Sequence, residues 1–300
     1  MRGPVPGSSR PGRHAVGVMG RGLFSRIFGG APQPARPEQP CLPPGQRLYA
    51  IGDVHGRFDL LERLLAEIRA DAASAPPGTA FTLLFLGDYV DRGLQSREVI
   101  ELLAGDPWPG ADKVFLRGNH DEMMRRFLEA PDSGRLWFDL GGAATLYSYG
   151  IGLGQPGGQQ GGGEDLAAAA GGPGGRRRRA AAADDWGTLA GRLAEALPAA
   201  HRRFLDETRF HYSAGDYLFV HAGVRPGVPL ARQDPEELMN IREPFLTDEV
   251  GCEQLVVHGH TPVRRPTVTP TRIAVDTGAY MSGRLTALVL EGGEQRFLQS

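Results

Sequence analysis

Short apolar runs alternate with helix-like periods through the first half of the chain. Three runs, at residues 47–51, 81–86 and 114–116, have the length and apolar content of buried strands. After the first run, leucines and an isoleucine recur every three or four residues, which indicates a helix with one buried face. The expected helices are residues 58–73, 96–103 with Ser96 as the N-cap, and 121–129. Strands that alternate with helices predict a βαβ arrangement with right-handed crossovers.

The second half of the chain has a different pattern. A helical stretch is expected from Trp186 to Thr208. Two short strands, 210–212 and 217–220, flank Ala214-Gly215-Asp216, as in a β-hairpin. Further apolar runs predict strands at residues 255–257, 272–275 and 285–290. We therefore predict an α/β fold in the form of an α+β sandwich, in which mixed sheets are flanked by helices.

Two regions lack any helical or strand period. Residues 1–45 are rich in Pro, Gly and Arg, and we expect a disordered tail, with Met1 and Met19 both open as the start. The composition of residues 151–185, rich in Gly, Ala and Arg, indicates a low-complexity insertion, which we expect to be mobile. The remaining chain, residues 46–300, is predicted to form one domain around that insertion.

Composition narrows the functional classes. A net charge of −2 over 300 residues gives no general attraction to nucleic acid or to an acidic membrane surface. The two cysteines, Cys41 and Cys252, have no metal-ligand spacing and are expected to be reduced thiols. No apolar stretch resembles a secretory signal or a membrane span. We expect a cytoplasmic protein with no nucleic-acid partner and no stable membrane insertion.

Metal-binding side chains recur just after the apolar runs. Five of the eight histidines lie in five short segments: Gly52-Asp53-Val54-His55-Gly56, Gly87-Asp88-Tyr89-Val90-Asp91-Arg92-Gly93, Gly118-Asn119-His120-Asp121, His221-Ala222-Gly223 and His258-Gly259-His260-Thr261. Strands deliver the residues that follow them to one edge of a sheet, so these segments can converge. Carboxylate, imidazole and amide donors suit Mn, Fe or Zn ions that activate water, whereas a structural zinc would favour thiolates.

The spacing suggests how two ions could be held. In extended backbone, Asp53 and His55 would point to the same side and share one ion. Asp88 is placed to bridge to a second ion about 3.5 to 4 Å away. Asn119, His221 and His260 can complete the second ion's shell, with His258 open as a more peripheral position.

Four charged residues remain for the substrate. His120 is placed to protonate a leaving oxygen, and Asp91 could hold its imidazole in the required tautomer. Arg92 could fork onto two phosphate oxygens, and Arg242 could clamp the phosphate from another side. A phosphoryl substrate suits both arginines.

From Arg47 to Leu298, apart from the insertion, the chain resembles the bacterial serine/threonine protein phosphatases. These belong to the phosphoprotein phosphatase branch of the calcineurin-like metallophosphoesterases, and the five segments above carry the resemblance. It implies a β-sandwich, two divalent ions of which Mn is favoured, and direct in-line attack by an ion-activated water. It also implies the metal-ligand, acid and phosphate-binding roles given above, and a phosphoprotein substrate.

The sequence is compatible with three hypotheses for the function. A sister group that resembles this chain cleaves diadenosine tetraphosphate symmetrically and usually lacks the second aspartate, so Asp91 favours a phosphoprotein phosphatase. Asp121 stands where protein phosphatases commonly have glutamate, and Asn240 where bacterial relatives often have an aromatic residue. The third hypothesis is a phosphatase-like binding protein without turnover. The oligomeric state, the physiological substrate and the native metal are not determined by the sequence.

Overall fold

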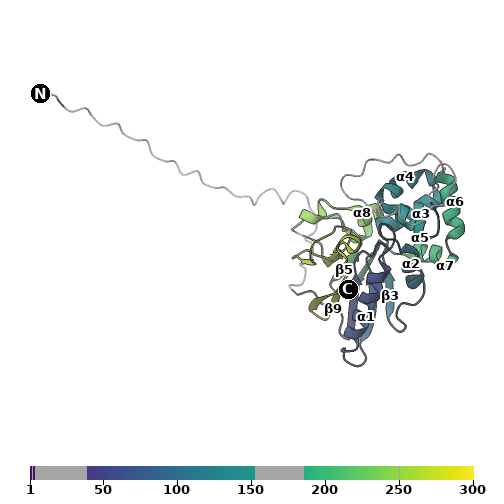
Figure 1. Cartoon of the computed structure of the whole chain (residues 1–300). Coiled ribbons are helices and arrows are strands. Elements are labelled where there is room, and N and C mark those ends of the chain that lie inside the picture. Colours follow the sequence, from purple (N-terminus) through teal and green to yellow (C-terminus); the bar gives the residue numbers. More distant parts are fainter. Residues whose placement is uncertain (2, 4–38, 153–185, 250) are drawn as a thin grey trace. The chain divides into compact units, whose positions relative to one another are not determined.

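Two five-stranded sheets form the centre of the domain in this computed structural model, which describes residues 1, 3, 39–152, 186–249 and 251–300 (Figure 1). The first sheet has the strand order β10-β9-β1-β2-β3 and the second β4-β5-β6-β8-β7. The strands of the first sheet are β1 Gln46–Ile51, β2 Ala80–Phe85, β3 Asp112–Phe115, β9 Thr286–Glu291 and β10 Glu294–Gln299. Those of the second are β4 His211–Ala214, β5 Tyr217–Val220, β6 Leu255–His258, β7 Thr267–Val268 and β8 Arg272–Ala274.

Both sheets are mixed. The strands β1, β2 and β3 are parallel, and β9 and β10 extend that sheet with antiparallel pairings. In the second sheet β5, β6 and β8 are parallel, while β4 and β7 are antiparallel edge strands. The predicted sandwich of mixed sheets and the predicted hairpin between β4 and β5 are confirmed.

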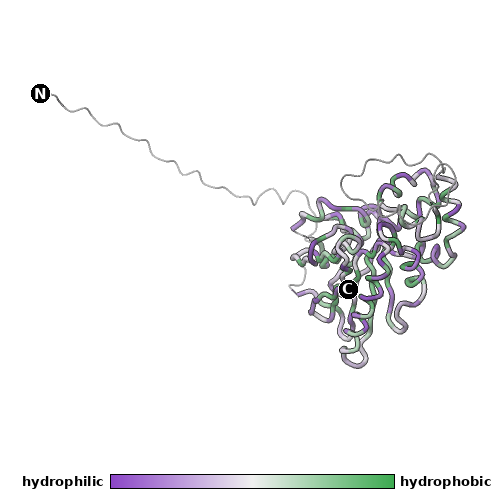
Figure 2. The backbone as a smooth tube through the Cα atoms, viewed as in Figure 1, coloured by the Kyte–Doolittle hydropathy of each residue, from purple (hydrophilic) through white to green (hydrophobic). Residues whose placement is uncertain are grey.

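Side-chain alternation along the strands explains the layers. In β1, Leu48 and Ala50 pack in the core between the two sheets, whereas Tyr49 and Ile51 pack against the helices on the other face. In β5, Tyr217 and Phe219 enter the same inter-sheet core. Figure 2 shows these strands as largely hydrophobic at the centre of the domain, with hydrophilic positions concentrated on the covering helices and loops. Burial on both faces accounts for the continuous apolar runs in the sequence.

The longer helices contribute to the hydrophobic cluster on the outer face of the first sheet. They are α1 Phe58–Ala72, α2 Ser96–Ala104, α3 Asn119–Glu129, α6 Trp186–Ala196 and α7 Ala199–Glu207, and within this group α6 packs against α3. Shorter helices are α4 Gly134–Trp137, α5 Ala143–Ser148, α8 Pro235–Asn240 and α9 Ala279–Ser282. The helices α4 and α5 are joined through a five-residue π-helical segment, Phe138–Gly142.

Three helix predictions need correction. The helix expected from Trp186 to Thr208 is two helices, because Pro198 cannot continue α6 and instead precedes α7. Ser96 does not cap α2; Gln95 is the N-cap, and the Ser96 side chain is buried and accepts a hydrogen bond from the Asp91 amide at 3.2 Å. The third helix begins at Asn119, two residues before the expected start.

The two irregular regions fall mostly outside the described residues. Nearly all of the predicted insertion, residues 153–185, and most of the predicted tail, residues 4–38, are among those not described. Leu42, however, is buried in the core between the sheets, and its amide donates to the Gly292 carbonyl at 2.8 Å. The packed domain therefore includes residues before position 46. Within the described ranges, the helices are all too short or too polar to cross a bilayer.

Candidate metal centre

The candidate residues follow strands of both sheets. Asp53 and His55 come after β1, Asp88 after β2, and Asn119 after β3. In the second sheet, His221 directly follows β5 and His260 lies two residues after β6. Because β1, β2 and β3 are parallel, as are β5 and β6, these segments meet at one edge of the sandwich.

Backbone strain is concentrated at this edge. Within the described ranges five non-glycine residues have a positive φ, and all five come from the motif segments: His55, Asp88, Asp91, Arg92 and His260. Such conformations cost about 1–3 kcal/mol each and persist where surrounding structure enforces them. His55, with φ of 47°, is therefore not in the extended conformation from which we argued that it shares a side with Asp53.

Asp88 lies between two groups of potential metal ligands. His55, Asp88 and His120 form one group, and Asp88, His221 and His260 form the other, with the donor atoms of each group within 4.8 Å of one another. One oxygen, Oδ2 of Asp88, lies 3.4 Å from Nε2 of His55 and 3.5 Å from Nε2 of His221. Burial alone would raise the pKa of Asp88, but the surrounding imidazoles hold it below its usual value. Asp88 therefore has the position that a shared ligand requires.

Hydrogen bonds fix the tautomers of two of these histidines. Nδ1 of His55 lies 2.9 Å from the Val90 carbonyl, and Nδ1 of His221 lies 2.8 Å from the Leu86 carbonyl. A carbonyl can only accept, so each Nδ1 carries the proton and each Nε2 is left facing Asp88. Burial lowers the pKa of His55 to about 3 and also lowers that of His221, so both rings are neutral. Each Nε2 thus presents a lone pair to the site.

Asn119 brings a further acceptor to the same place. With the amide oriented as in the structure, its Oδ1 lies 3.1 Å from Nε2 of His221 and 3.0 Å from Nδ1 of His260. In this orientation the lone pair of His221 and the amide oxygen are both acceptors, and a cation near both would make their close approach favourable. The donor set therefore fits a divalent ion on this side of Asp88.

Asp53 lies at the margin of the cluster. It is buried, it belongs to neither three-residue group, and its carboxylate accepts a hydrogen bond from the His260 amide at 3.1 Å. Burial, together with the carboxylates of Asp276 and Asp88, raises its pKa well above the usual value. A bound cation would offset this repulsion between neighbouring carboxylates.

His120 is held by the Asp91 carboxylate. Nδ1 of His120 lies 2.7 Å from Oδ2 of Asp91. The same oxygen accepts a hydrogen bond from Nε1 of Trp137 at 2.9 Å, and Oδ1 of Asp91 accepts one from the Thr145 hydroxyl at 2.7 Å. Burial would lower the pKa of His120, but Asp88 and the hydrogen bond to Asp91 raise it. Both residues are buried, and the hydrogen bond to Asp91 orients the His120 ring.

Arg92 spans the two imidazoles of the first group. Its guanidinium donates to Nε2 of His55 and to Nε2 of His120, both at 2.9 Å. The same guanidinium lies 4.7 Å from the centre of the Tyr280 ring, and that ring also packs edge-on against His55. Arg92 is thus aimed at the space between the candidate ligands and the proposed acid.

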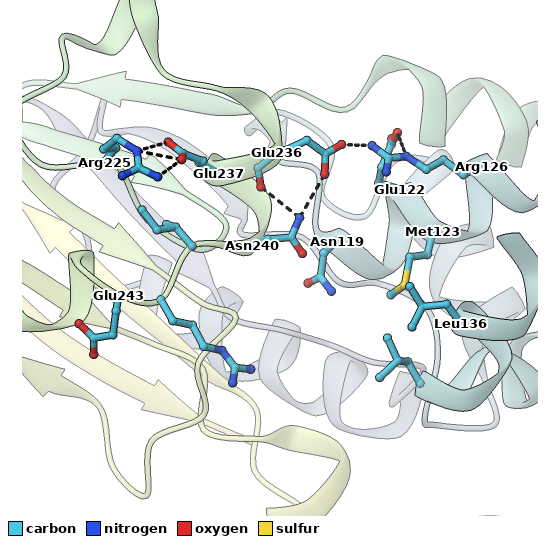
Figure 3. Close-up of a pocket in the computed structure, with 13 residues that line it drawn as sticks. Asn119, Glu122, Met123, Arg126, Leu136, Arg225, Glu236, Glu237, Asn240 and Glu243 are labelled. Carbon is cyan, nitrogen blue, oxygen red and sulfur yellow. Dashed lines mark hydrogen bonds and ion pairs between the residues drawn. The ribbon is translucent and has the colours of Figure 1, made fainter.

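A pocket opens beside Asn119 (Figure 3). It has a volume of about 700 Å³ and is lined by residues of α3 and α8 and by the segment that carries Arg242. Figure 3 shows ion pairs across its wall, between Arg126 and both Glu122 and Glu236 and between Arg225 and Glu237. Arg242 is exposed and, within the part of the chain that the structure describes, makes no ion pair. It is therefore available to a ligand that enters beside Asn119.

His258 lies away from the ligand groups. Its ring is buried beside Phe245, its Nδ1 is 3.0 Å from the Gly259 carbonyl, and its Nε2 has no partner in the described part of the chain. Burial lowers its pKa to about 4. The choice of His260 over His258 as a ligand agrees with this placement, although it stays a prediction.

The structure also gives contacts to residues for which the sequence predicted no role in the site. Asp121 accepts hydrogen bonds from the amides of Asp88, Tyr89 and Gly118, at 2.8, 2.9 and 2.9 Å, so it joins two of the loops. Asp276 is buried near Asp53 and follows an apolar strand, the same signal that marked the other segments. Trp137, Thr145 and Tyr280 carried no sequence signal, because only the fold brings them to Asp91 and Arg92.

Comparisons with known proteins agree with this geometry. Residues 46–283 match the profile of the calcineurin-like phosphoesterases. The chain is 32% identical over 97 residues to serine/threonine-protein phosphatase 2 of Escherichia coli, a segment that is 32% of this chain and 39% of that protein. It is 46% identical over 74 residues to a symmetrical bis(5'-nucleosyl)-tetraphosphatase of Methylococcus capsulatus, 25% of this chain and 23% of that protein.

A solved structure shows the same fold. It is a protein named as a candidate diadenosine tetraphosphatase, with a TM-score of 0.51 and 21% identity over 85% of this chain and 93% of that one. The alignments to the two sequence relatives span less than half of either protein, so they do not transfer a whole-protein activity. Two mixed sheets, a cluster of ligands at their shared edge and a family match over most of its length establish that this chain belongs to the calcineurin-like phosphoesterases, a family of metal-dependent hydrolases.

Proposed function

We propose that the chain is a serine/threonine phosphoprotein phosphatase. The observation that carries this proposal is the buried pair of Asp91 and His120, with 2.7 Å between Oδ2 and Nδ1. The sister group that cleaves dinucleoside polyphosphates resembles this chain but usually lacks the second aspartate. Here that aspartate is not only present but held by Trp137 and Thr145, which supports a role for it in the site.

Six residues are proposed to hold two divalent ions that share Asp88. Their donors are oxygen and nitrogen atoms, and no cysteine contributes, which favours Mn and admits Fe or Zn. Such ions generate a nucleophile from water at neutral pH and neutralise charge on a phosphoryl group. The proposed ligands are Asp53, His55, Asp88, Asn119, His221 and His260.

The remaining residues are proposed to act on the phosphate. Arg92 would turn its two N–H groups from His55 and His120 towards two phosphate oxygens, and Arg242 would approach from the neighbouring pocket. Once Arg92 has moved, Nε2 of His120 is free to carry a proton, which the raised pKa of this histidine favours. That proton would pass to the leaving oxygen of the serine or threonine, while Asp91 stabilises the ring.

A dinucleoside polyphosphate is the second candidate substrate. The match to the Methylococcus capsulatus enzyme, whose name states that it acts on bis(5'-nucleosyl)-tetraphosphate, favours it. The pocket beside Asn119 argues for a peptide instead: Leu136 and Leu140 in its wall are exposed, and its charged residues, apart from Arg242, are largely paired with one another. Within this pocket Arg242 is the arginine available to a substrate phosphate.

A direct comparison of substrates tests the proposal. The full chain loaded with Mn would be assayed on p-nitrophenyl phosphate, a phosphoserine peptide, a phosphotyrosine peptide and diadenosine tetraphosphate, with a chelator as control. We expect hydrolysis of the phosphoserine peptide at the highest kcat/KM, and loss of all turnover with the chelator. Preferential cleavage of diadenosine tetraphosphate would replace this function with the second candidate. Absence of any turnover with Mn, Fe or Zn would point to a binding protein.

A further inference from the structure

A second pocket, rich in arginine, lies next to the candidate metal centre. It has a volume of about 1050 Å³ and shares no residue with the pocket beside Asn119. Its lining includes Arg264, Arg265 and Arg284 and contains no aspartate or glutamate. All three arginines are exposed, and within the described ranges none of them makes an ion pair. The pocket therefore concentrates positive charge that the protein itself does not neutralise.

Two of the other arginines that line a pocket are compensated. Arg126 and Arg225 line the pocket beside Asn119 and each pairs with a glutamate. Three guanidinium groups around one cavity repel one another, and a bound anion would relieve that repulsion. Guanidinium also presents N–H groups in a planar fork that matches carboxylate and phosphate oxygens. The pocket is thus chemically suited to an oxyanion.

The segments that carry these arginines are fixed relative to each other. The Val263 amide, next to Arg264, donates to the Asp276 carbonyl at 2.9 Å. The Arg284 carbonyl accepts a hydrogen bond from Thr277 at 2.9 Å, and its amide donates to Ser282 at 3.1 Å. Backbone positions on both sides of the pocket are therefore set by hydrogen bonds, although the arginine side chains extend into solvent.

Two residues that line the pocket are close in sequence to residues of the metal centre. Pro262 lines it and is two residues from His260, so their Cα atoms are at most about 7 Å apart. Met281 also lines it and directly follows Tyr280, whose ring packs against His55 and Arg92. A separation of about 7 Å corresponds to about two residues of extended peptide. A substrate with its phosphate at the metal centre could thus place a neighbouring group in this pocket.

We infer that this arginine pocket binds a second anionic group of the same substrate, an acidic side chain or a second phosphate located about two residues from the scissile phosphoserine or phosphothreonine. The inference rests on the proposed phosphoprotein phosphatase activity and adds a preference for acidic sequences to it. The arginines would contribute to affinity for the peptide and would take no part in cleaving the phosphate bond.

The test compares three phosphoserine peptides of one parent sequence on the full Mn-loaded protein. One has neutral flanks, one has aspartate two residues from the phosphoserine on each side, and one has a second phosphoserine there. The variant Arg264→Gln/Arg265→Gln/Arg284→Gln is compared with a charge-matched control, Arg63→Gln/Arg202→Gln/Arg203→Gln, whose exposed arginines lie on α1 and α7. The quantity measured is the ratio of kcat/KM for each anionic peptide to that for the neutral one.

We expect the wild type and the control to favour an anionic peptide by about tenfold, and the pocket variant to lose that preference. The preference should also shrink as salt is raised, because the arginines are exposed. Which anionic peptide is favoured distinguishes a carboxylate from a phosphate. Equal kcat/KM on all peptides in the wild type, or a preference that survives in the pocket variant, would overturn the inference that the arginine pocket binds an anionic group. Either result would leave the phosphatase proposal standing. Hydrolysis of p-nitrophenyl phosphate or diadenosine tetraphosphate without hydrolysis of any peptide would overturn both.

Discussion

Gly118 packs directly against Asp88, so closely that a side chain at position 118 would collide with the Asp88 carboxylate and amide. The Gly118 amide also donates to Asp121 at 2.9 Å, in the same network that holds the Asp88 backbone. The loop before α3 can therefore deliver Asn119 and His120 to the site only if residue 118 has no Cβ. A substitution at position 118 therefore tests whether metal binding and turnover need this loop geometry in addition to the ligands themselves.

Gly118→Ala is expected to displace Asp88 or the loop that carries Asn119, and so to lower the bound Mn and the turnover of p-nitrophenyl phosphate at least about tenfold. The matched control is Gly191→Ala on α6, where an added Cβ meets nothing within 4 Å. That control should retain turnover. Wild-type metal content in Gly118→Ala would show that the loop adapts and that the contact is not required.

Asp91→Asn is expected to lower turnover by about 10²- to 10⁴-fold while metal content stays near that of the wild type. The reason is that Asp91 contacts His120, Trp137 and Thr145 and lies outside both ligand groups. Metal analysis of the same sample, together with assay of the leaving-group dependence, checks the prediction. Loss of metal in proportion to the loss of turnover would instead give Asp91 a structural role in the metal site.

Asp88→Asn is expected to remove both ions, because Asp88 is the one residue common to the two ligand groups. Substitution of His55 or of His260, each found in a single group, should have a smaller effect on total bound metal. The stoichiometry of bound Mn, measured by elemental analysis after gel filtration, distinguishes these outcomes. A single ion retained at full occupancy in Asp88→Asn would contradict the shared-ligand assignment.

Asp71→Asn is expected to destabilise the protein by about 1–3 kcal/mol at neutral pH. Asp71 accepts hydrogen bonds from Tyr49 at 2.7 Å and from Arg47 at 3.2 Å, and it pairs with Arg296. Arg47 lies near the start of β1, whereas the candidate metal ligands follow its end. Burial would raise the pKa of Asp71, but these partners lower it below its usual value. Its stabilising contribution is therefore present above the unfolded pKa of about 4 and is lost as the pH falls through the folded pKa.

The measurement is urea unfolding of the wild type and Asp71→Asn from pH 7 down to the lowest pH at which the wild type stays folded. The difference in the free energy of unfolding should shrink as the pH falls. Asp112→Asn, at an exposed carboxylate without an ion pair in the described chain, serves as the control. A difference that does not depend on pH would mean that the charge of Asp71 contributes nothing.

Much of the fold followed from local patterns. The ends of β1, β2 and α1 lie within one residue of the expected positions, because each is a long run with a clear period and burial on a defined face. β10, Glu294–Gln299, was missed because an edge strand with mixed polar and apolar residues has only a weak pattern. The break at Pro198 was missed because the apolar spacing continues on both sides of it.

The candidate site was predictable to the extent that residue type reveals chemistry. His221 and Asp88 could be proposed from their place after apolar runs, and the structure brings them to 3.5 Å. The backbone conformation of Asp88 could not be predicted, because its positive φ depends on the loops packed around it. The hydrogen bond from Trp137 to Asp91 could not be predicted either, since it joins residues 46 apart in sequence.

The two sheets are tied together at the edge where the candidate ligands meet. The His260 amide, from the second sheet, reaches Asp53 of the first, and the His221 ring reaches the Leu86 carbonyl that follows β2. Ions held by residues of both sheets would act as reversible cross-links between the halves of the sandwich. Loading would then raise the melting temperature in a concentration-dependent way, by an amount equivalent to about 2.7 kcal/mol at a hundredfold excess over Kd. Thermal stability would thus report how full the site is, independently of any substrate.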